Sequence, residues 1–160
     1  MIRIRPYKDS DEGKVLSWCA DEEAFYMWTA GVLGDYPATP EKFAKTGEAM
    51  RFTALDETEV AGFFTIRNPK NTLDELRFGF VIVDPHKRGK GVGKAMLQLG
   101  LDFAFGIYKA EKVTLGVFED NAPARACYAS IGFVETGERE TYSINGEDWP
   151  CIEMECRRPS

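Results

Sequence analysis

Two periods of apolar and polar residues divide this chain of 160 residues into expected strands and helices. Alternation with a period of two is typical of a strand that has one buried face. It predicts strands over residues 1–7, 50–55, 60–67, 73–83, 112–118, 133–143 and 149–156. Apolar positions three and four apart are typical of an amphipathic helix. They predict helices over residues 9–20, 21–28, 91–105 and 122–131.

The order of these elements predicts the fold class. It reads β-α-α-β-β-β-α-β-α-β-β, with a strong hairpin signal at Asn145-Gly146. Hairpins near both ends and strand–helix–strand connections in the middle give a sheet with parallel and antiparallel neighbours. We therefore expect an α/β (α+β) fold with a mixed central sheet of about seven strands, about four flanking helices and a single domain over residues 1–160.

The strand over residues 73–83 is long and has an alternating pattern. Its alternation predicts that one face holds Leu76, Phe78, Phe80 and Ile82. Polar residues become rarer toward its end, as in a strand that enters the middle of a sheet. Gly79 is the predicted position of a β-bulge.

A basic, glycine-rich turn follows this strand. Residues 88–94 read Arg-Gly-Lys-Gly-Val-Gly-Lys and lie between the strand terminator Asp84-Pro85 and an expected helix. Glycines let backbone N–H groups point at an anion, and a helix N-terminus carries about half a positive charge. Lys87 and three basic residues within the turn add full charges. The pattern predicts a site for the pyrophosphate of a nucleotide-containing cofactor.

The composition indicates which classes of partner the chain is not expected to bind. The formal net charge is −6, so the basic turn contrasts with an acidic background, and we expect no nucleic-acid partner. The four cysteines form no C-x-x-C pair and His86 is the one histidine, which predicts no metal site and free thiols in the cytoplasm. No signal-peptide pattern and no apolar run of about 18 residues is visible, so we expect no membrane partner.

Two common phosphate loops do not fit the turn. A Walker A loop requires G-x-x-x-x-G-K-[ST], but Arg88 and Ala95 stand where its first glycine and its hydroxyl residue belong. The Rossmann fingerprint G-x-G-x-x-G fails in both frames, because Lys94 or Met96 occupies the position of the last glycine. The turn therefore disfavours an ATPase and a dinucleotide-binding protein.

A third pattern fits in two blocks. Arg88-x-x-Gly91-x-Gly93, after a strand that ends in Val83-Asp-Pro, resembles the acyl-CoA pyrophosphate loop of the GNAT superfamily of N-acetyltransferases. Residues 121–133, Asn-Ala-Pro-Ala-Arg-Ala-Cys-Tyr-Ala-Ser-Ile-Gly-Phe, resemble that family's N-x-x-A-x-x-x-Y-x-x-x-G-F helix. The two blocks stand in the family's order, and the expected elements match the superfamily over nearly the whole chain.

The resemblance implies which residues bind acetyl-CoA. The backbone of Val81 and Val83 would hold the pantetheine arm, provided that the strands over 73–83 and 112–118 splay apart. The basic turn would hold the pyrophosphate, and Asn121 would lie near the cofactor while it caps its helix. The predicted cofactor contacts are Val81, Ile82, Val83, Arg88, Gly89, Lys90, Gly91, Val92, Gly93, Lys94, Asn121, Ala124 and Tyr128.

The resemblance also implies a catalytic acid and leaves the base open. Tyr128 would protonate the departing CoA thiolate, and a phenol with a pKa near 10 is a suitable donor. An amine must lose a proton before it attacks the thioester. Glu75 is the predicted base, with Glu119 or a water relay as alternatives. The glutamate that some relatives carry five residues before Asn121 is absent, because that position is Gly116.

The acceptor side is only outlined by the sequence. Trp28 and Tyr142 are the predicted substrate contacts. The resemblance implies transfer of an acetyl group from acetyl-CoA to a primary amine, on a small molecule or a peptide, by direct attack in a ternary complex. A homodimer is expected by the habit of the family. The alternative is an acyl-CoA-binding sensor without efficient turnover, since no residue is an unambiguous base.

Overall fold

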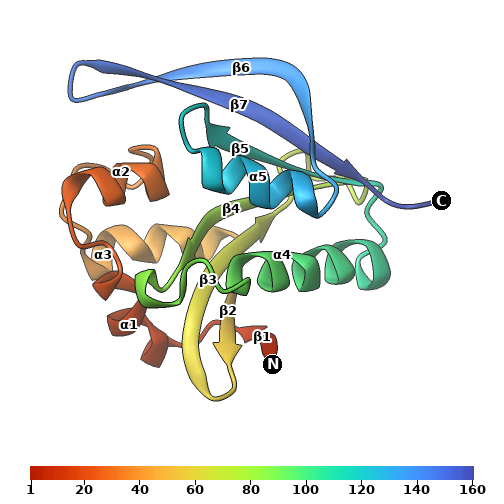
Figure 1. Ribbon diagram of the computed structural model, residues 1–160, viewed down its shortest axis with the longest axis horizontal. Helices are drawn as coiled ribbons and strands as arrows, with labels where there is room; N and C mark the ends of the chain where they lie inside the picture. The colour runs from red at the N-terminus through yellow and green to blue at the C-terminus, as the bar shows by residue number, and fades with distance from the viewer.

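The computed structural model describes residues 1–160, which build one seven-stranded sheet with helices on both faces (Figure 1). The strands lie in the order β1-β2-β3-β4-β5-β7-β6. Only β4 and β5 are parallel neighbours, and all other neighbours are antiparallel. The prediction of a mixed sheet of about seven strands with flanking helices is confirmed.

The observed elements follow the predicted order with small shifts in their ends. The strands are β1 (Ile2–Pro6), β2 (Met50–Asp56), β3 (Glu59–Arg67), β4 (Glu75–Val83), β5 (Lys112–Phe118), β6 (Val134–Ile144) and β7 (Glu147–Arg157). The α-helices are α1 (Glu12–Ser17), α2 (Glu22–Thr29), α3 (Pro40–Phe43), α4 (Val92–Asp102) and α5 (Ala122–Ser130). Three 3-10 turns are η1 (Asp9–Asp11), η2 (Ala44–Glu48) and η3 (Pro85–Lys87), and the π-helical turn η4 (Phe103–Ile107) extends α4. None of the helices is both long and apolar enough to cross a lipid bilayer.

The first predicted helix, over residues 9–20, is wrong in its extent. It consists of η1 and the short α1, which ends at Ser17. The last turn tightens there, because the N–H groups of Trp18 and Cys19 bond to carbonyls only three residues back.

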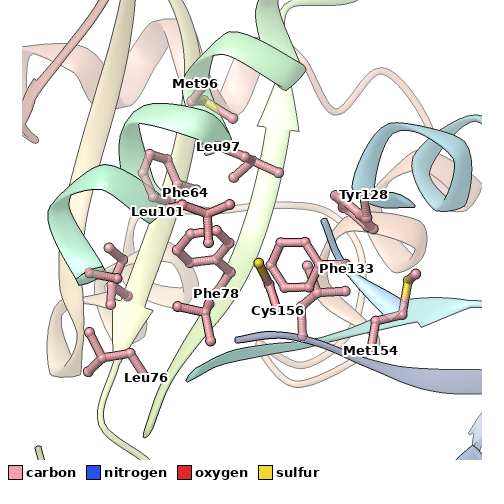
Figure 2. Packing of buried hydrophobic residues seen from close by; sticks show 14 of the residues in the cluster. Phe64, Leu76, Phe78, Met96, Leu97, Leu101, Tyr128, Phe133, Met154 and Cys156 are labelled. Carbon is pink, nitrogen blue, oxygen red and sulfur yellow. The ribbon is translucent and has the colours of Figure 1, made fainter. Parts of the chain in front are cut away.

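The two faces of the sheet carry separate cores. Helices α4 and α5 cover one face, where Leu97 and Leu101 of α4 pack toward Phe64 in the larger core (Figure 2). Helices α1, α2 and α3 lie away from α4 and α5 (Figure 1), and their core contains Trp28 and Phe63. Phe63 and Phe64 are neighbours in β3 but belong to different cores, because successive strand residues point to opposite faces.

The parallel strands β4 and β5 separate soon after they start. They pair only over Glu75–Arg77 and Lys112–Thr114. Beyond these residues, β4 continues to Val83 and β5 to Phe118 without further pairing between them. The facing edges therefore carry backbone N–H and C=O groups that no neighbouring strand satisfies. The sheet contains the gap that the proposed pantetheine contacts at Val81 and Val83 require.

Strand β4 contains a bulge at Phe80, one residue after the predicted position. Thr65 of β3 pairs with Gly79 and Phe63 pairs with Ile82, which leaves an extra residue on β4. Phe80 has a φ of 48°, which is unusual for a bulky residue. The indole N–H of Trp28 donates a hydrogen bond of 2.9 Å to the Phe80 carbonyl and holds the bulge from the α2 side.

The bulge changes which side chains of β4 share a face. Leu76 and Phe78 lie in the core beneath α4, and Val81 packs against that same core. Phe80 and Ile82 belong to the core beneath α1, α2 and α3. The prediction that the four even-numbered residues share one face is therefore wrong, because the inserted residue shifts the alternation by one.

Asp11 joins η1 to the first two strands. Its carboxylate accepts two hydrogen bonds of 2.8 Å from Arg5, one of 2.7 Å from Thr53 and one of 3.0 Å from the Lys8 backbone. Burial opposes ionisation of this carboxyl group, but these donors outweigh it and lower its pKa from 3.8 to about 2. The ionised carboxylate therefore stabilises the folded chain.

We expect Asp11→Asn to lower the free energy of unfolding by about 2 kcal/mol at pH 7. Because the folded pKa lies below the unfolded one, the carboxylate's contribution is complete above about pH 4 and is lost as the pH falls toward 2. Urea titrations at pH 7 and pH 3 should show a smaller difference between variant and wild type at pH 3. The exposed Asp9→Asn is the control, and a pH-independent difference for Asp11→Asn would contradict this assignment.

Candidate functional site

A cavity of about 1500 Å³ occupies the gap between β4 and β5. On one side its walls come from the turn at residues 88–94 and from α5. On the other side they come from α2, the turn at residues 45–49 and the end of β3. The β6–β7 hairpin arches over α2 (Figure 1), and Asn145 at its tip donates a hydrogen bond to Glu22 of that helix.

The glycine-rich turn has the backbone shape that the sequence predicts. Gly89 and Gly91 adopt φ values of 77° and 81°, which a residue with a side chain rarely adopts. Gly91 is the N-cap of α4, so the first N–H groups of the helix point toward the turn without intrahelical partners. Gly93 packs α4 closely on β4, since a Cβ atom there would lie 3.4 Å from the Val83 Cγ2 atom. The turn is thus shaped to bind an anion.

The basic residues in and next to the turn differ in whether they form ion pairs. Lys87 pairs with Asp56 and Glu59 of the β2–β3 turn at 3.1 Å each, so its charge is already compensated. Arg88, Lys90 and Lys94 form no ion pair. Arg88 and Lys94 line the cavity, whereas Lys90 does not. Lys87 also lines the cavity, but its carboxylate partners compensate its charge, so Arg88 and Lys94 supply the positive charge that is free of ion pairs.

The other predicted cofactor contacts also gather at this cavity. Val81, Ile82 and Val83 line it along the unpaired edge of β4. Asn121 caps α5 as predicted, accepting a hydrogen bond of 3.3 Å from the Ala124 N–H. The amide nitrogen of Asn121 makes no hydrogen bond to protein. Asn121 and Ala124 both line the cavity.

Tyr128 projects from α5 into the same space. Figure 2 shows its ring beside α5, near Phe133 and apart from the α4 side chains. The ring meets Phe133 edge to face with 6.1 Å between centroids, and the residue is 8% exposed. Tyr128 lines the cavity, and its hydroxyl group makes no hydrogen bond to protein. Burial raises its pKa above the usual 10, so the phenol is protonated at neutral pH.

The predicted bases do not reach the cavity. Glu75 lies in the paired end of β4, where Lys70 and Lys112 each pair with it at 3.3 Å. Burial opposes ionisation of Glu75, but the two lysines outweigh it and lower the pKa. Six strand residues, or roughly 20 Å, separate it from Val81. Glu119 pairs with Arg139 at 2.7 Å and also lies outside the cavity lining.

The predicted acceptor contacts do line the cavity. Trp28 uses its indole N–H to hold the bulge, so it offers the cavity an apolar ring. Tyr142 of β6 packs edge to face on Phe118 with 5.9 Å between centroids. Its hydroxyl group lies 3.4 Å from a Glu140 oxygen, and burial raises its pKa.

Several polar cavity residues were not predicted from the sequence. Thr65, Arg67 and Arg77 line the wall on the α2 side. The alternation of β4 already placed Arg77 on one face with Gly79, but the pairing with β3 that brings Arg67 beside it is not encoded in any local motif. Trp18 also lines the cavity, and its buried indole N–H has no hydrogen-bond partner.

Comparison with known proteins assigns the family. The family model described as the acetyltransferase (GNAT) family matches residues 10–133 of this chain. This range includes the glycine-rich turn and all of α5. The chain belongs to the GNAT acetyltransferase family. The resemblance seen in the two sequence blocks is therefore confirmed.

Individual relatives of this GNAT chain have different substrates in their names. A spermidine N(1)-acetyltransferase of Vibrio cholerae is 36% identical over 67 residues, which are 41% of this chain and 39% of that protein. An N-alpha-acetyltransferase of Sulfurisphaera tokodaii is 33% identical over 113 residues, which are 65% of this chain and 68% of that protein. The chain spans about two fifths of the length of the polyamine acetyltransferases that it matches.

Solved structures agree on the fold. The crystal structure of spermidine N-acetyltransferase from Vibrio cholerae in complex with CoA and spermine matches with a TM-score of 0.82 at 20% identity. The match covers 98% of the GNAT chain and 95% of that chain. At this identity the likeness shows the fold.

Proposed function

We propose that this chain is an acetyl-CoA-dependent N-acetyltransferase that acts on a primary amine, with residues 1–160 as one catalytic domain. The observation that carries the proposal is the cavity between the unpaired ends of β4 and β5, which meets an anion-binding turn at one end. Membership of the GNAT family and the CoA bound to the Vibrio cholerae neighbour agree with this donor.

The residues present fit acetyl-CoA as the donor substrate. The free backbone groups at Val81 and Val83 suit the two amides of a pantetheine arm, as in the addition of a strand to a sheet edge. The N–H groups at the start of α4, together with Arg88 and Lys94, suit a pyrophosphate. When bound, acetyl-CoA supplies a thioester whose carbonyl carbon an amine can attack.

Residues of the chain would assist each part of the transfer. A C–N bond forms to the acetyl carbon and the C–S bond breaks, while the bulge at Phe80 leaves nearby backbone N–H groups free to stabilise the carbonyl oxygen. Tyr128 gives its phenolic proton to the departing sulfur and is reprotonated by the second proton that the nitrogen loses as the amide forms. The first proton of the ammonium group passes to water, because the single carboxylate that lines the cavity, Glu48, is exposed in the turn at residues 45–49. A water relay is therefore our preferred base, ahead of Glu75 and Glu119.

Thiol release from acetyl-CoA tests this function against the sensor alternative. We expect purified chain to release CoA only when a suitable amine is added, with one acetylated amine formed per thiol. Mass spectrometry of the amine and a thiol reagent measure the two products. A chain that binds acetyl-CoA but releases no thiol with any amine of a broad panel would favour the sensor. Replacing acetyl-CoA with longer acyl-CoA thioesters tests the choice of acyl group.

A further inference from the structure

The cavity wall on the α2 side carries two arginines next to each other. Arg67 of β3 lies directly opposite Arg77 of β4, and Thr65 lies opposite Gly79 one step nearer the bulge. Directly opposite residues of an antiparallel pair point to the same face of a sheet. All four residues line the cavity.

Arg77 is fixed and its charge is compensated. Its guanidinium donates two hydrogen bonds to Glu153 of β7 and one of 3.1 Å to Thr114 of β5. It crosses β5 above Gly116, where a Cβ atom would lie only 3.1 Å from the Arg77 Nη2 atom. The missing side chain at Gly116 therefore lets Arg77 form part of the cavity floor.

Arg67 has no such compensation. It lies at the exposed end of β3 and forms no ion pair, so its guanidinium is free to bind an anion. On this side of the cavity the other charged lining residues are Lys45 and Glu48. The cavity wall on the α2 side thus carries more positive than negative charge. This charge suits an acceptor with an anionic group and disfavours a polycation.

Thr65 supplies a second unused group. The residue is 1% exposed, lines the cavity and donates no hydrogen bond to protein. Gly79 opposite leaves this hydroxyl uncovered, since a Cβ atom there would lie 3.0 Å from the Thr65 Oγ1 atom. The Thr65 hydroxyl is therefore available to a ligand in the cavity.

We propose that the acceptor carries a carboxylate close to its amine, as a small amino acid does, and that Arg67 and the Thr65 hydroxyl bind that carboxylate. Arg77 positions Arg67 by occupying the space beside it. This inference rests on the proposed function and names the substrate class of the same cavity. Arg77 lies three strand residues from the bulge at Phe80, or about 10 Å, a span that the long Arg67 side chain and a short acceptor can cover together.

The test compares L-amino acids with their carboxamides and with spermidine as acceptors. We expect kcat/KM to be at least about tenfold higher for the acids than for the amides, because hydrogen bonds to a charged group are the stronger ones. Arg67→Ala should remove this preference and Arg67→Glu should invert it, while Thr65→Val weakens it. The exposed Arg3→Ala is the matched control and should retain it. Equal rates for acids and amides, a preference for spermidine, or a preference that survives Arg67→Ala would overturn the proposal.

A binding measurement separates this inference from the proposed function. We expect an N-acetyl amino acid to bind the CoA-loaded chain at least about tenfold more tightly than its amide in calorimetric titrations, and Arg67→Ala to abolish the difference. If no amine releases CoA but this difference is present, the transferase function fails and the carboxylate site stands. Equal binding of acid and amide would overturn the carboxylate site whether or not the chain is a transferase.

Discussion

Replacing Gly91 with valine is expected to weaken acetyl-CoA binding by about a hundredfold. Gly91 has a φ of 81°, and a β-branched residue is strained there. Relief of that strain would turn the N–H groups at the start of α4 away from the pyrophosphate. Two lost hydrogen bonds to a charged group, at about 1.5 kcal/mol each, correspond to about a hundredfold in Kd.

Calorimetric titration with acetyl-CoA measures this loss, and Gly137→Val provides the control. Gly137 in β6 also has a positive φ, of 91°, and no neighbouring atom would touch an added Cβ at either position. Both variants therefore introduce backbone strain, but only Gly91→Val should lose affinity. Wild-type affinity in Gly91→Val would show that the turn does not bind the pyrophosphate.

Replacing Tyr128 with phenylalanine is expected to lower kcat by about a hundredfold or more, because the departing thiolate loses its proton donor. The Kd for acetyl-CoA should change little, since the ring and its packing on Phe133 remain. The free energy of unfolding should not fall, because the hydroxyl group makes no hydrogen bond to protein. Single-turnover assays with the cognate amine, with Tyr108→Phe as the control, measure the chemical step.

The pH dependence gives a second test of Tyr128. Burial raises its pKa, so the acid is available throughout the neutral range and is lost only in alkaline solution, above the usual value of 10. A loss of kcat on the alkaline side should therefore lie above about pH 10 in the wild type and disappear in Tyr128→Phe. Full turnover by Tyr128→Phe would remove the acid role.

The donor half of the site could be predicted because its signals are local. The turn at residues 88–94 and the cap at Asn121 depend on residues that are neighbours in the chain. The same holds for the hairpin turn at Asn145-Gly146, where both residues have a positive φ, as a tight two-residue turn requires.

The sequence-based predictions differ from the structure where contacts with residues distant in the chain determine the position of a group. The bulge falls at Phe80 because Trp28, 52 residues away, donates a hydrogen bond to its carbonyl. Lys87 lines the cavity, but carboxylates of the β2–β3 turn compensate its charge. The position of Glu75 on β4 predicts a base near the reacting atoms, but pairing of β4 with β5 holds it at the far end of the strand. These outcomes depend on contacts between segments that are distant in the sequence, which no single segment encodes.

The proposed acceptor site depends on the register between β3 and β4. Arg67 and Arg77 are ten residues apart and meet only because β3 and β4 pair with Thr65 opposite Gly79. Neither residue belongs to a recognisable motif. In the proposed function, the motifs that resemble the GNAT family would bind the donor, and the side chains that β3 and β4 bring together would bind the acceptor.

We propose that β4 and the glycine-rich turn bind two parts of one donor molecule. Calorimetric titration of the wild-type chain with acetyl-CoA, and then with acetyl-pantetheine, measures the two contributions. We expect one acetyl-CoA site per chain and binding of acetyl-pantetheine that is weaker by about a hundredfold, since the fragment lacks the pyrophosphate. Absence of binding to acetyl-CoA, or equal affinity for the two molecules, would contradict it.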